Sequence, residues 1–508
     1  MSDDSKRNAW KPVLDDLERR RGGARAMGGE AKLVRQRQGG RLDARARLVA
    51  LFDAGSFEEL GTLVGGVGRG GLAAAPADAL IAGHGTIDAR PVLAGAEDFT
   101  VLGGSIGLGA HAKRVRLVRL AAQERVPLVM LLDGAGERAT KALERYPYAP
   151  NDLQALAALS GLVPTVAVVM GPSAGHGALT APLMDLVVMV EGGALFSAGP
   201  PLVEAATGEK ATKEELGGCA VHVAASGVAH NRAASDAEAL ALVRRYLGYF
   251  PSNAWSEAPA GTGDVGERRL DEMPDLVPAN PARPYDVRRV LDALADAGSV
   301  LEIQPEYGAS LLTVLACLGG RSVAIVANQP AVRAGAIDRE AADKAAHFLE
   351  VAGAFHLPVI LLADNPGVMP GRAAERAGAL RSAARMFFAQ AKLRSPKIHV
   401  TLRKAYGFGS SVMGMNPFDR QTATLAFPVA HLGAMPAAGG GEAARASEEV
   451  RERLAAVEHG GPWSAADTMS YDEVIDPRDL RNALLRALRL SGARRGSPRP
   501  PRRRGIRP

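Results

Sequence analysis

Four glycine-rich turns, each close behind an apolar run, are the part of this sequence best suited to chemistry. They occupy residues 134–137 (Gly-Ala-Gly-Glu), 175–177 (Gly-His-Gly), 365–367 (Asn-Pro-Gly) and 407–409 (Gly-Phe-Gly). A strand that ends in such a turn before a helix leaves backbone N–H groups without partners at the helix start. These groups can hold a developing oxyanion, and each donor is commonly worth about 3 kcal/mol of reaction barrier.

The turns belong to two copies of one pattern. At a spacing of 231 residues, Pro127, Asp133 and Gly136 match Pro358, Asp364 and Gly367, and Arg90, Gly104 and Lys113 match Arg321, Gly335 and Lys344. At a spacing of 232, Pro164, Gly175 and Gly177 match Pro396, Gly407 and Gly409. Matches this numerous at nearly one spacing predict a duplicated domain.

The elements that must position these turns are buried strands and the helices after them. An apolar run bounded by Pro and Gly is typical of a buried parallel strand. From residue 80 to 100 we expect a meander of short strands. Residues 103–107 then open a helix that carries Lys113 and Arg114, in a turn that resembles a phosphate cradle. Asp133 and Asp364 end strands, where we expect them to cap turns.

The rest of the chain sets the domain boundaries. We expect a helical leader over residues 1–60, a first α/β domain over 61–255, and a Pro/Ser/Gly-rich linker over 256–284. A second α/β domain then covers 285–490 and a disordered basic tail covers 491–508. Within these, residues 151–162, 209–218 and 442–458 and a segment after residue 478 read as helices. The tail carries seven arginines and no acid, so the net charge of +6 falls to about −1 without it.

Composition excludes several classes of protein. Cys219 and Cys317 are too few for a disulfide framework or a four-thiolate zinc site, so a reducing cytoplasm is expected. The sequence contains no run of 18 apolar residues, so no membrane span is predicted. The N-terminus lacks the apolar core of a signal peptide. His84, His111 and His347 show no spacing typical of metal ligands. We therefore expect no metal, no membrane partner and no specific nucleic-acid partner.

Several short passages, taken together, resemble one enzyme family. They are residues 40–45 (Gly-Arg-Leu-Asp-Ala-Arg), 53–57 (Asp-Ala-Gly-Ser-Phe), 103–105 (Gly-Gly-Ser), 207–209 with 214–218, and 364–367 with 403–407 (Arg-Lys-Ala-Tyr-Gly). Over roughly residues 27–490 the chain resembles the carboxyltransferase (β) subunits of biotin-dependent acyl-CoA carboxylases, such as propionyl-CoA carboxylase.

The resemblance implies a tandem pair of crotonase-like (ClpP/crotonase) ββα-spiral domains and a hexamer of such chains. In this family the active site lies where the N-terminal domain of one subunit faces the C-terminal domain of another. The implied reaction moves a carboxyl group from carboxybiotin to the α-carbon of a short or branched acyl-CoA through an enolate, and no side-chain base is needed. The chain has no biotinylation site of the Ala-Met-Lys-Met kind. Biotin would thus arrive on a separate biotin carboxylase or carrier subunit.

Carried over by position, the resemblance also implies roles for single residues. The N–H groups of Gly175 and His176 would hold the enolate oxygen, and those of Phe408 and Gly409 the biotin ureido oxygen. The positions implied to line the substrate sites are Gly103, Gly104, Ser105, Lys113, Arg114, Gly136, Glu137, Gly367 and Ser411. Ser411 falls where the family tunes acyl-chain length.

The sequence departs from the family at the turns themselves, which keeps alternatives open. The family usually has Gly-Gly at 175–176, Gly-Ala at 408–409 and Ser-Gly-Gly-Ala at 134–137. A side chain keeps the N–H donor but disfavours φ above zero. The same site can also run as a decarboxylase or transcarboxylase. The alternatives are a biotin-independent crotonase-type hydratase or hydrolase with Glu137 or His176 as acid/base, and a non-catalytic CoA-binding paralogue; His176 can also be a packed histidine.

Overall fold

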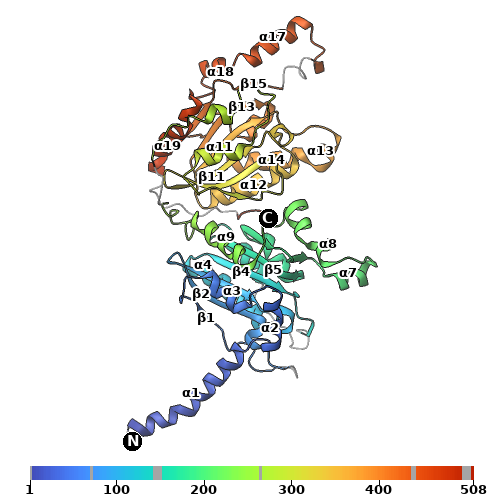
Figure 1. Cartoon of the computed structure of the whole chain (residues 1–508), viewed down its shortest axis with the longest axis vertical. Helices are drawn as coiled ribbons and strands as arrows, with labels where there is room; N and C mark the ends of the chain where they lie inside the picture. The colour runs from blue at the N-terminus through green and yellow to red at the C-terminus, as the bar shows by residue number, and fades with distance from the viewer. Residues whose placement is uncertain (1–2, 69–72, 141–151, 262–265, 436–441, 495–504) are drawn as a thin grey trace. The chain divides into compact units, whose positions relative to one another are not determined.

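The computed structural model describes residues 3–68, 73–140, 152–261, 266–435, 442–494 and 505–508. The chain divides into two compact units, Met1–Leu247 (unit 1) and Gly248–Arg507 (unit 2). In Figure 1, the elements of unit 1 run from blue to green and those of unit 2 from green to red. Each unit contains one of the two sequence copies and is built around its own sheet.

The sheet of unit 1 has the strand order β1-β2-β3-β4-β5-β6-β8, with β7 paired to β5. Its strands are β1 (Glu58–Leu60), β2 (Leu80–Ile87), β3 (Arg90–Glu97), β4 (Leu128–Gly134), β5 (Thr165–Ala174), β6 (Leu186–Val190), β7 (Ala194–Phe196) and β8 (Asn231–Ala233). From β3 to β8 the pairing is parallel, as the apolar runs predict. The expected meander over residues 80–100 is instead one hairpin of β2 and β3, because Asp88 and Ala89 turn the chain with φ of 49° and 60°.

The sheet of unit 2 repeats this plan in the order β16-β14-β13-β12-β11-β10-β9, with β15 paired to β13. Its strands are β9 (Leu301–Ile303), β10 (Leu311–Leu318), β11 (Arg321–Asn328), β12 (Val359–Asn365), β13 (Lys397–Tyr406), β14 (Ala423–Ala426), β15 (His431–Gly433) and β16 (Glu473–Val474). The hairpin of β10 and β11 turns at Gly319 and Gly320, whose φ values of 61° and 71° match the turn in unit 1.

Helices follow the strands in the same order in both units. In unit 1, α4 (Leu108–Glu124) links β3 to β4, α5 (Asp152–Leu159) precedes β5, and α6 (Gly175–Leu179) follows it. In unit 2 the corresponding helices are α12 (Arg339–Ala354), α14 (Ala379–Ala391) and α15 (Gly407–Val412). The duplicated domain predicted from the sequence is therefore present, and the matched turns fall at matched places.

The remaining helices flank these repeats. They are α1 (Asp3–Arg25), α2 (Glu30–Gln38), α3 (Ala44–Leu51), α7 (Pro200–Thr207), α8 (Lys213–Gly217), α9 (Asp236–Gly248), α10 (Met273–Leu276), α11 (Val287–Leu294), α13 (Arg372–Ala377), α17 (Glu448–His459), α18 (Trp463–Asp467) and α19 (Leu480–Leu490). The helix expected from residue 209 begins only at Lys213, because Thr212 and Glu215 form a capping box there.

Further expectations concerned the basic tail, membrane spans and the cysteines. Most of the basic tail lies outside the described residues, but Arg507 pairs with Glu350 in unit 2 at 2.7 Å. No helix in the described ranges is both long and apolar enough to cross a membrane. Cys219 and Cys317 are free thiols. A cytoplasmic location stays a prediction.

Candidate active site

The glycine-rich turns of each repeat meet at the carboxyl ends of three neighbouring strands. In unit 1, Ala135 N donates to Gly103 O at 2.9 Å and Ile106 N donates to Gly136 O at 2.8 Å. In unit 2, Ile337 N donates to Gly367 O at 3.1 Å. Ligands of parallel α/β sheets bind outside this end of the strands. The structure thus brings together most of the turn residues singled out in the sequence.

The positive φ falls on glycine in both turns that open a short helix. Gly175 has a φ of 51° and Gly407 a φ of 55°, while His176 and Phe408 lie in the ordinary negative region. Because only glycine adopts that conformation without strain, the side chains at 176 and 408 cost the backbone nothing. The departures from the family's glycines therefore leave the N–H groups of both helix starts in place.

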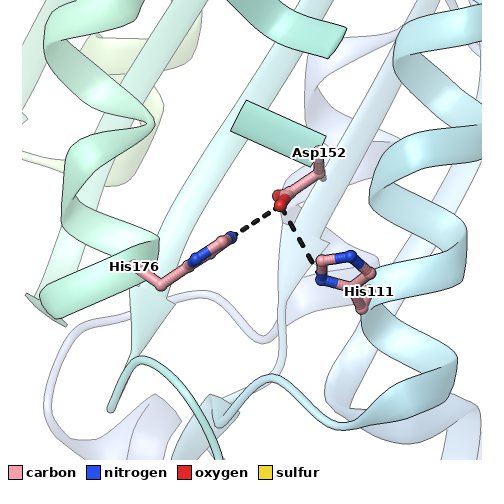
Figure 2. Close-up of side chains that lie close together, drawn as sticks. All are labelled: His111, Asp152 and His176. Carbon is pink, nitrogen blue, oxygen red and sulfur yellow. Dashed lines mark hydrogen bonds and ion pairs between the residues drawn. The ribbon is translucent and has the colours of Figure 1, made fainter. Parts of the chain in front are cut away.

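Unlike its counterpart in unit 2, the turn of unit 1 is backed by a network of charged side chains, shown in part in Figure 2. His176 Nε2 lies 2.6 Å from Asp152 Oδ1, and Arg114 Nε donates to Asp152 Oδ2 at 2.7 Å. Arg114 also donates to Glu97 Oε1 at 3.0 Å and to the hydroxyl of Thr180. The network runs from the strand end to His176, whose side chain is 23% exposed.

The network shifts the titration of its buried acids. Burial alone would raise the pKa of Asp152, but the hydrogen bonds from His176 and Arg114 and the Arg114 charge hold it well below its usual range. Burial raises the pKa of Glu97 despite Arg114 and the N–H of Asp133. Asp152 is therefore held as a carboxylate, which accepts from both neighbours.

His111 joins this cluster from α4. Its Nδ1 lies 3.7 Å from Asp152 Oδ1, and ligand atoms of His111, Asp152 and His176 all lie within 4.8 Å of one another. The spacing along the sequence gave no sign of this set, because its members come from three separate elements. The arrangement is that of hydrogen-bonded side chains, since Nε2 of His176 contacts the carboxylate directly at 2.6 Å.

The two matched aspartates form buried ion pairs with arginines. The sequence predicts instead that they cap turns. Asp133 accepts from Arg47 at 2.9 Å and from Arg41. Asp364 accepts from Arg403 Nε at 2.7 Å and from the Tyr285 hydroxyl at 3.0 Å. Arg47, Asp133, Arg403 and Asp364 have no exposed side-chain surface. These pairs anchor the strand ends behind the turns.

Two basic residues expected to line the substrate site have buried side chains. Lys113 Nζ donates to the carbonyls of Ala77 at 2.9 Å and Leu80 at 2.7 Å, and burial lowers its pKa to about 8. Lys344, its counterpart, donates to Gln304 O at 3.2 Å, and burial lowers its pKa to about 7. The buried guanidinium of Arg114 is engaged in the network above. A substrate role for Lys113 or Arg114 stays a prediction.

The other predicted site residues lie on the turns. Ser105 donates to Leu102 O at 2.8 Å, and Arg138 donates to the carbonyl of Ser105 at 2.9 Å. Glu137 is exposed beside Gly136, and Ser411 is exposed on α15. Gly103 and Gly104 turn the chain with φ of 64° and 67°. The roles of Gly103, Gly104, Ser105, Gly136, Glu137, Gly367 and Ser411 toward a substrate stay predictions.

Comparison with known proteins identifies the family to which this chain belongs. Residues 35–506 match the carboxyl transferase domain family. The chain belongs to this family. It is 35% identical to the methylmalonyl-CoA decarboxylase subunit alpha of Veillonella parvula, over 95% of this chain and 96% of the relative. It is also 35% identical to the propionyl-CoA carboxylase beta chain of Roseobacter denitrificans, over 94% of this chain and 96% of that one.

A solved structure supports the same conclusion. The transcarboxylase 12S crystal structure with methylmalonyl-coenzyme A and methylmalonic acid bound matches with a TM-score of 0.90 at 34% identity, covering 98% of this chain and 99% of that chain. The fold is thus the tandem crotonase-like carboxyltransferase fold expected from the resemblance. The chain is a carboxyltransferase of the biotin-dependent acyl-CoA carboxylase and transcarboxylase class, with acyl-CoA as substrate.

Proposed function

We propose that this carboxyltransferase acts on an acyl-CoA of the propionyl or methylmalonyl size and holds the thioester oxygen at the N–H groups of Gly175 and His176. The observation that carries the proposal is the shared geometry of the two repeats. In each, a glycine at positive φ ends a buried strand and begins a short helix. Two donor sets on matched turns suit a reaction that must hold two carbonyl oxygens.

The proposed role of residues 175–176 is electrostatic stabilisation of the enolate. When the α-carbon of a thioester loses its proton or its carboxyl group, negative charge moves to the carbonyl oxygen. Amides already aimed at that oxygen stabilise the enolate without further reorganisation, at about 3 kcal/mol for each donor. The buried pair of Asp133 with Arg47 fixes the neighbouring strand end, which keeps the turn rigid.

The turn at 407–409 fits the ureido oxygen of biotin in the same way. The amides of Phe408 and Gly409 lie in the first turn of α15. A Cβ on Gly409 would lie 2.6 Å from Asn365 Oδ1 and 2.8 Å from Gly367 Cα, so only glycine lets these turns pack this closely. Phe408 is 54% exposed and offers an apolar surface beside the amides. When bound, biotin supplies the nitrogen that carries the carboxyl group.

The substrate class and the assembly are proposed from the relatives. The decarboxylase and carboxylase relatives carry methylmalonyl-CoA and propionyl-CoA in their names, and the 12S structure is described as a hexamer with methylmalonyl-coenzyme A bound. Ser411, the position where the resemblance implies that acyl-chain length is tuned, is exposed on α15. We therefore propose a homohexamer that works with a biotin carboxylase or biotin carrier subunit.

Decarboxylation with free biotin tests the proposal. The purified chain is mixed with methylmalonyl-CoA with and without biotin, and the appearance of propionyl-CoA is followed by mass spectrometry. We expect decarboxylation that depends on biotin and persists in His176→Gln, because the amide at 176 remains. Hydration or hydrolysis of an acyl-CoA that is independent of biotin would favour the hydratase or hydrolase alternative. Binding of CoA without any turnover would favour the non-catalytic paralogue.

A further inference from the structure

The side chain of His176 is oriented as an acid–base residue, a role that backbone donors do not require. Its Nε2 contacts Asp152 at 2.6 Å, and Asp152 is fixed in turn by Arg114 at 2.7 Å. A carboxylate can only accept, so Nε2 carries the hydrogen and the neutral imidazole has its lone pair on Nδ1. Among the described residues, that Nδ1 has no hydrogen-bond partner.

The same positions of the second repeat show that the fold does not need this arrangement. Glu97, His111 and Arg114 correspond to Asn328, Ala342 and Ala345 at the 231-residue spacing. Asp152 corresponds to Ala383 or Ala384, and His176 to Phe408. Unit 2 forms the same strand, turn and short helix without these charges. The charged chain in unit 1 therefore serves something other than the fold of a repeat.

We propose that His176, oriented by Asp152, exchanges a proton with the α-carbon of the bound acyl-CoA. Nδ1 takes the α-proton, the electrons of the C–H bond form the enolate double bond, and the thioester oxygen takes the charge at the amides of residues 175–176. A solvent proton on Nδ1 then returns to the carbon. The inference rests on the proposed function because it needs the thioester oxygen at this turn. It adds a biotin-independent activity, the exchange of α-hydrogens with water.

The charged groups around His176 suit this role. Asp152 lies on α5, His111 and Arg114 lie on α4, and Glu97 lies on β3. Arg114 neutralises the charge of Glu97. Further back, Asp133 on β4 is paired with Arg41 and Arg47. A metal ion fits less well. It would have to break the 2.6 Å contact, since zinc needs each ligand at about 2.0–2.2 Å, and Arg114 already places a positive charge on Asp152.

The test is hydrogen exchange in heavy water. The full chain is incubated with propionyl-CoA in D2O without biotin or a partner, and the α-methylene signal is followed by proton NMR. We expect loss of this signal at a rate that rises with pH along one ionisation. His176→Gln should slow exchange by at least about 100-fold and abolish the pH dependence. Asp152→Asn should lower the rate by at least about tenfold with little change in KM, because Asp152 positions the histidine and does not touch the substrate.

Controls separate this inference from folding defects and from the proposed function. His84→Gln, a matched change at an exposed histidine of β2, should leave the exchange rate unchanged. Circular dichroism verifies that each variant is folded. Equal exchange in wild type and His176→Gln would overturn the inference, as would biotin-dependent decarboxylation by an enzyme that shows no exchange. Failure of both reactions overturns both proposals. Exchange that a chelator abolishes, with one bound metal ion for each chain, would replace the acid–base role with a metal site.

Discussion

The two repeats share the arrangement of their backbones but differ in the side chains that lie behind the glycine-rich turn. Asp133 N donates to Glu97 Oε2 at 2.8 Å, and Asp364 N donates to Asn328 Oδ1 at 3.2 Å. The fold thus needs an acceptor at this position and not a charge. In unit 1 the acceptor is a carboxylate that continues into Arg114, whereas unit 2 has Ala345 in place of that arginine.

The comparison teaches that scaffold and chemistry can be separated within one chain. Both repeats have a buried aspartate paired with an arginine, although the two arginines come from different elements, and both keep the buried lysine and the glycine at positive φ. Within the residues that the structure describes, unit 1 alone has a charged path that ends at a partly exposed imidazole. The shared residues hold the strand ends in place. The charged path of unit 1 changes which chemistry is possible at its turn.

The largest effect is expected from breaking the buried pairs. Arg403→Ala should cost about 3–5 kcal/mol of unfolding free energy, because Asp364 loses a fully buried partner. The carbonyls of Asn280 and Arg283 also lose a donor at 2.8 Å. Arg47→Ala should cost a similar amount, because Asp236 also loses its contact with Arg47 at 2.9 Å, although Arg41 still reaches Asp133. Urea unfolding of both variants, followed by circular dichroism, gives the values.

The matched control for these changes is an exposed arginine. The side chain of Arg269 is 51% exposed and contacts Asp271. Arg269→Ala should lower the free energy of unfolding by no more than about 0.5 kcal/mol. An Arg403→Ala variant as stable as Arg269→Ala would contradict the idea that the buried pair anchors the strand end.

A smaller effect is expected from the last glycine of each turn. Gly409→Ala should cost about 1–3 kcal/mol, because its Cβ would meet Asn365 Oδ1 at 2.6 Å. Gly177→Ala should be almost neutral, because the nearest atoms to its Cβ, Glu97 Oε1 and Ser173 Oγ, lie at 3.5 Å. Thermal unfolding of the two variants checks the difference. Equal losses in both repeats would mean that the two turns are packed alike.

A further effect, which depends on pH, is expected from the matched lysines. Burial lowers the pKa of Lys344 to about 7 and that of Lys113 to about 8, while a lysine in the unfolded chain keeps its ordinary pKa of 10.5. The unfolded chain therefore binds more protons between these values, and stability rises with pH there, by up to about 1.4 kcal/mol for each pH unit and group. Lys344→Met should flatten the curve from pH 7 upward and Lys113→Met from pH 8 upward. Unfolding curves parallel to wild type would contradict burial of the ammonium groups.

Sequence reasoning found the backbone features and missed the side-chain network, for a physical reason. Gly175 and Gly407 repeat at a fixed spacing, and buried strands are visible as apolar runs, so turns and sheets could be placed. Asp152 and His176 lie on separate helices, α5 and α6, and meet only in the folded unit, and neither has a charged counterpart in the second copy that would mark it. The partners of Asp133 come from residues 41 and 47 of the leader, whose packing no local pattern encodes.

The central claim is that amides of two matched turns, those of residues 175–176 and of residues 408–409, serve different ligands in the two repeats, and paired glycine variants test it most directly. Gly175→Ala and Gly407→Ala impose similar strain, since the φ values are 51° and 55°. The KM values for methylmalonyl-CoA and for free biotin are measured in the decarboxylation assay. We predict that Gly175→Ala raises only the KM for methylmalonyl-CoA and Gly407→Ala only the KM for biotin. Variants that change both constants alike, or neither, would contradict the claim.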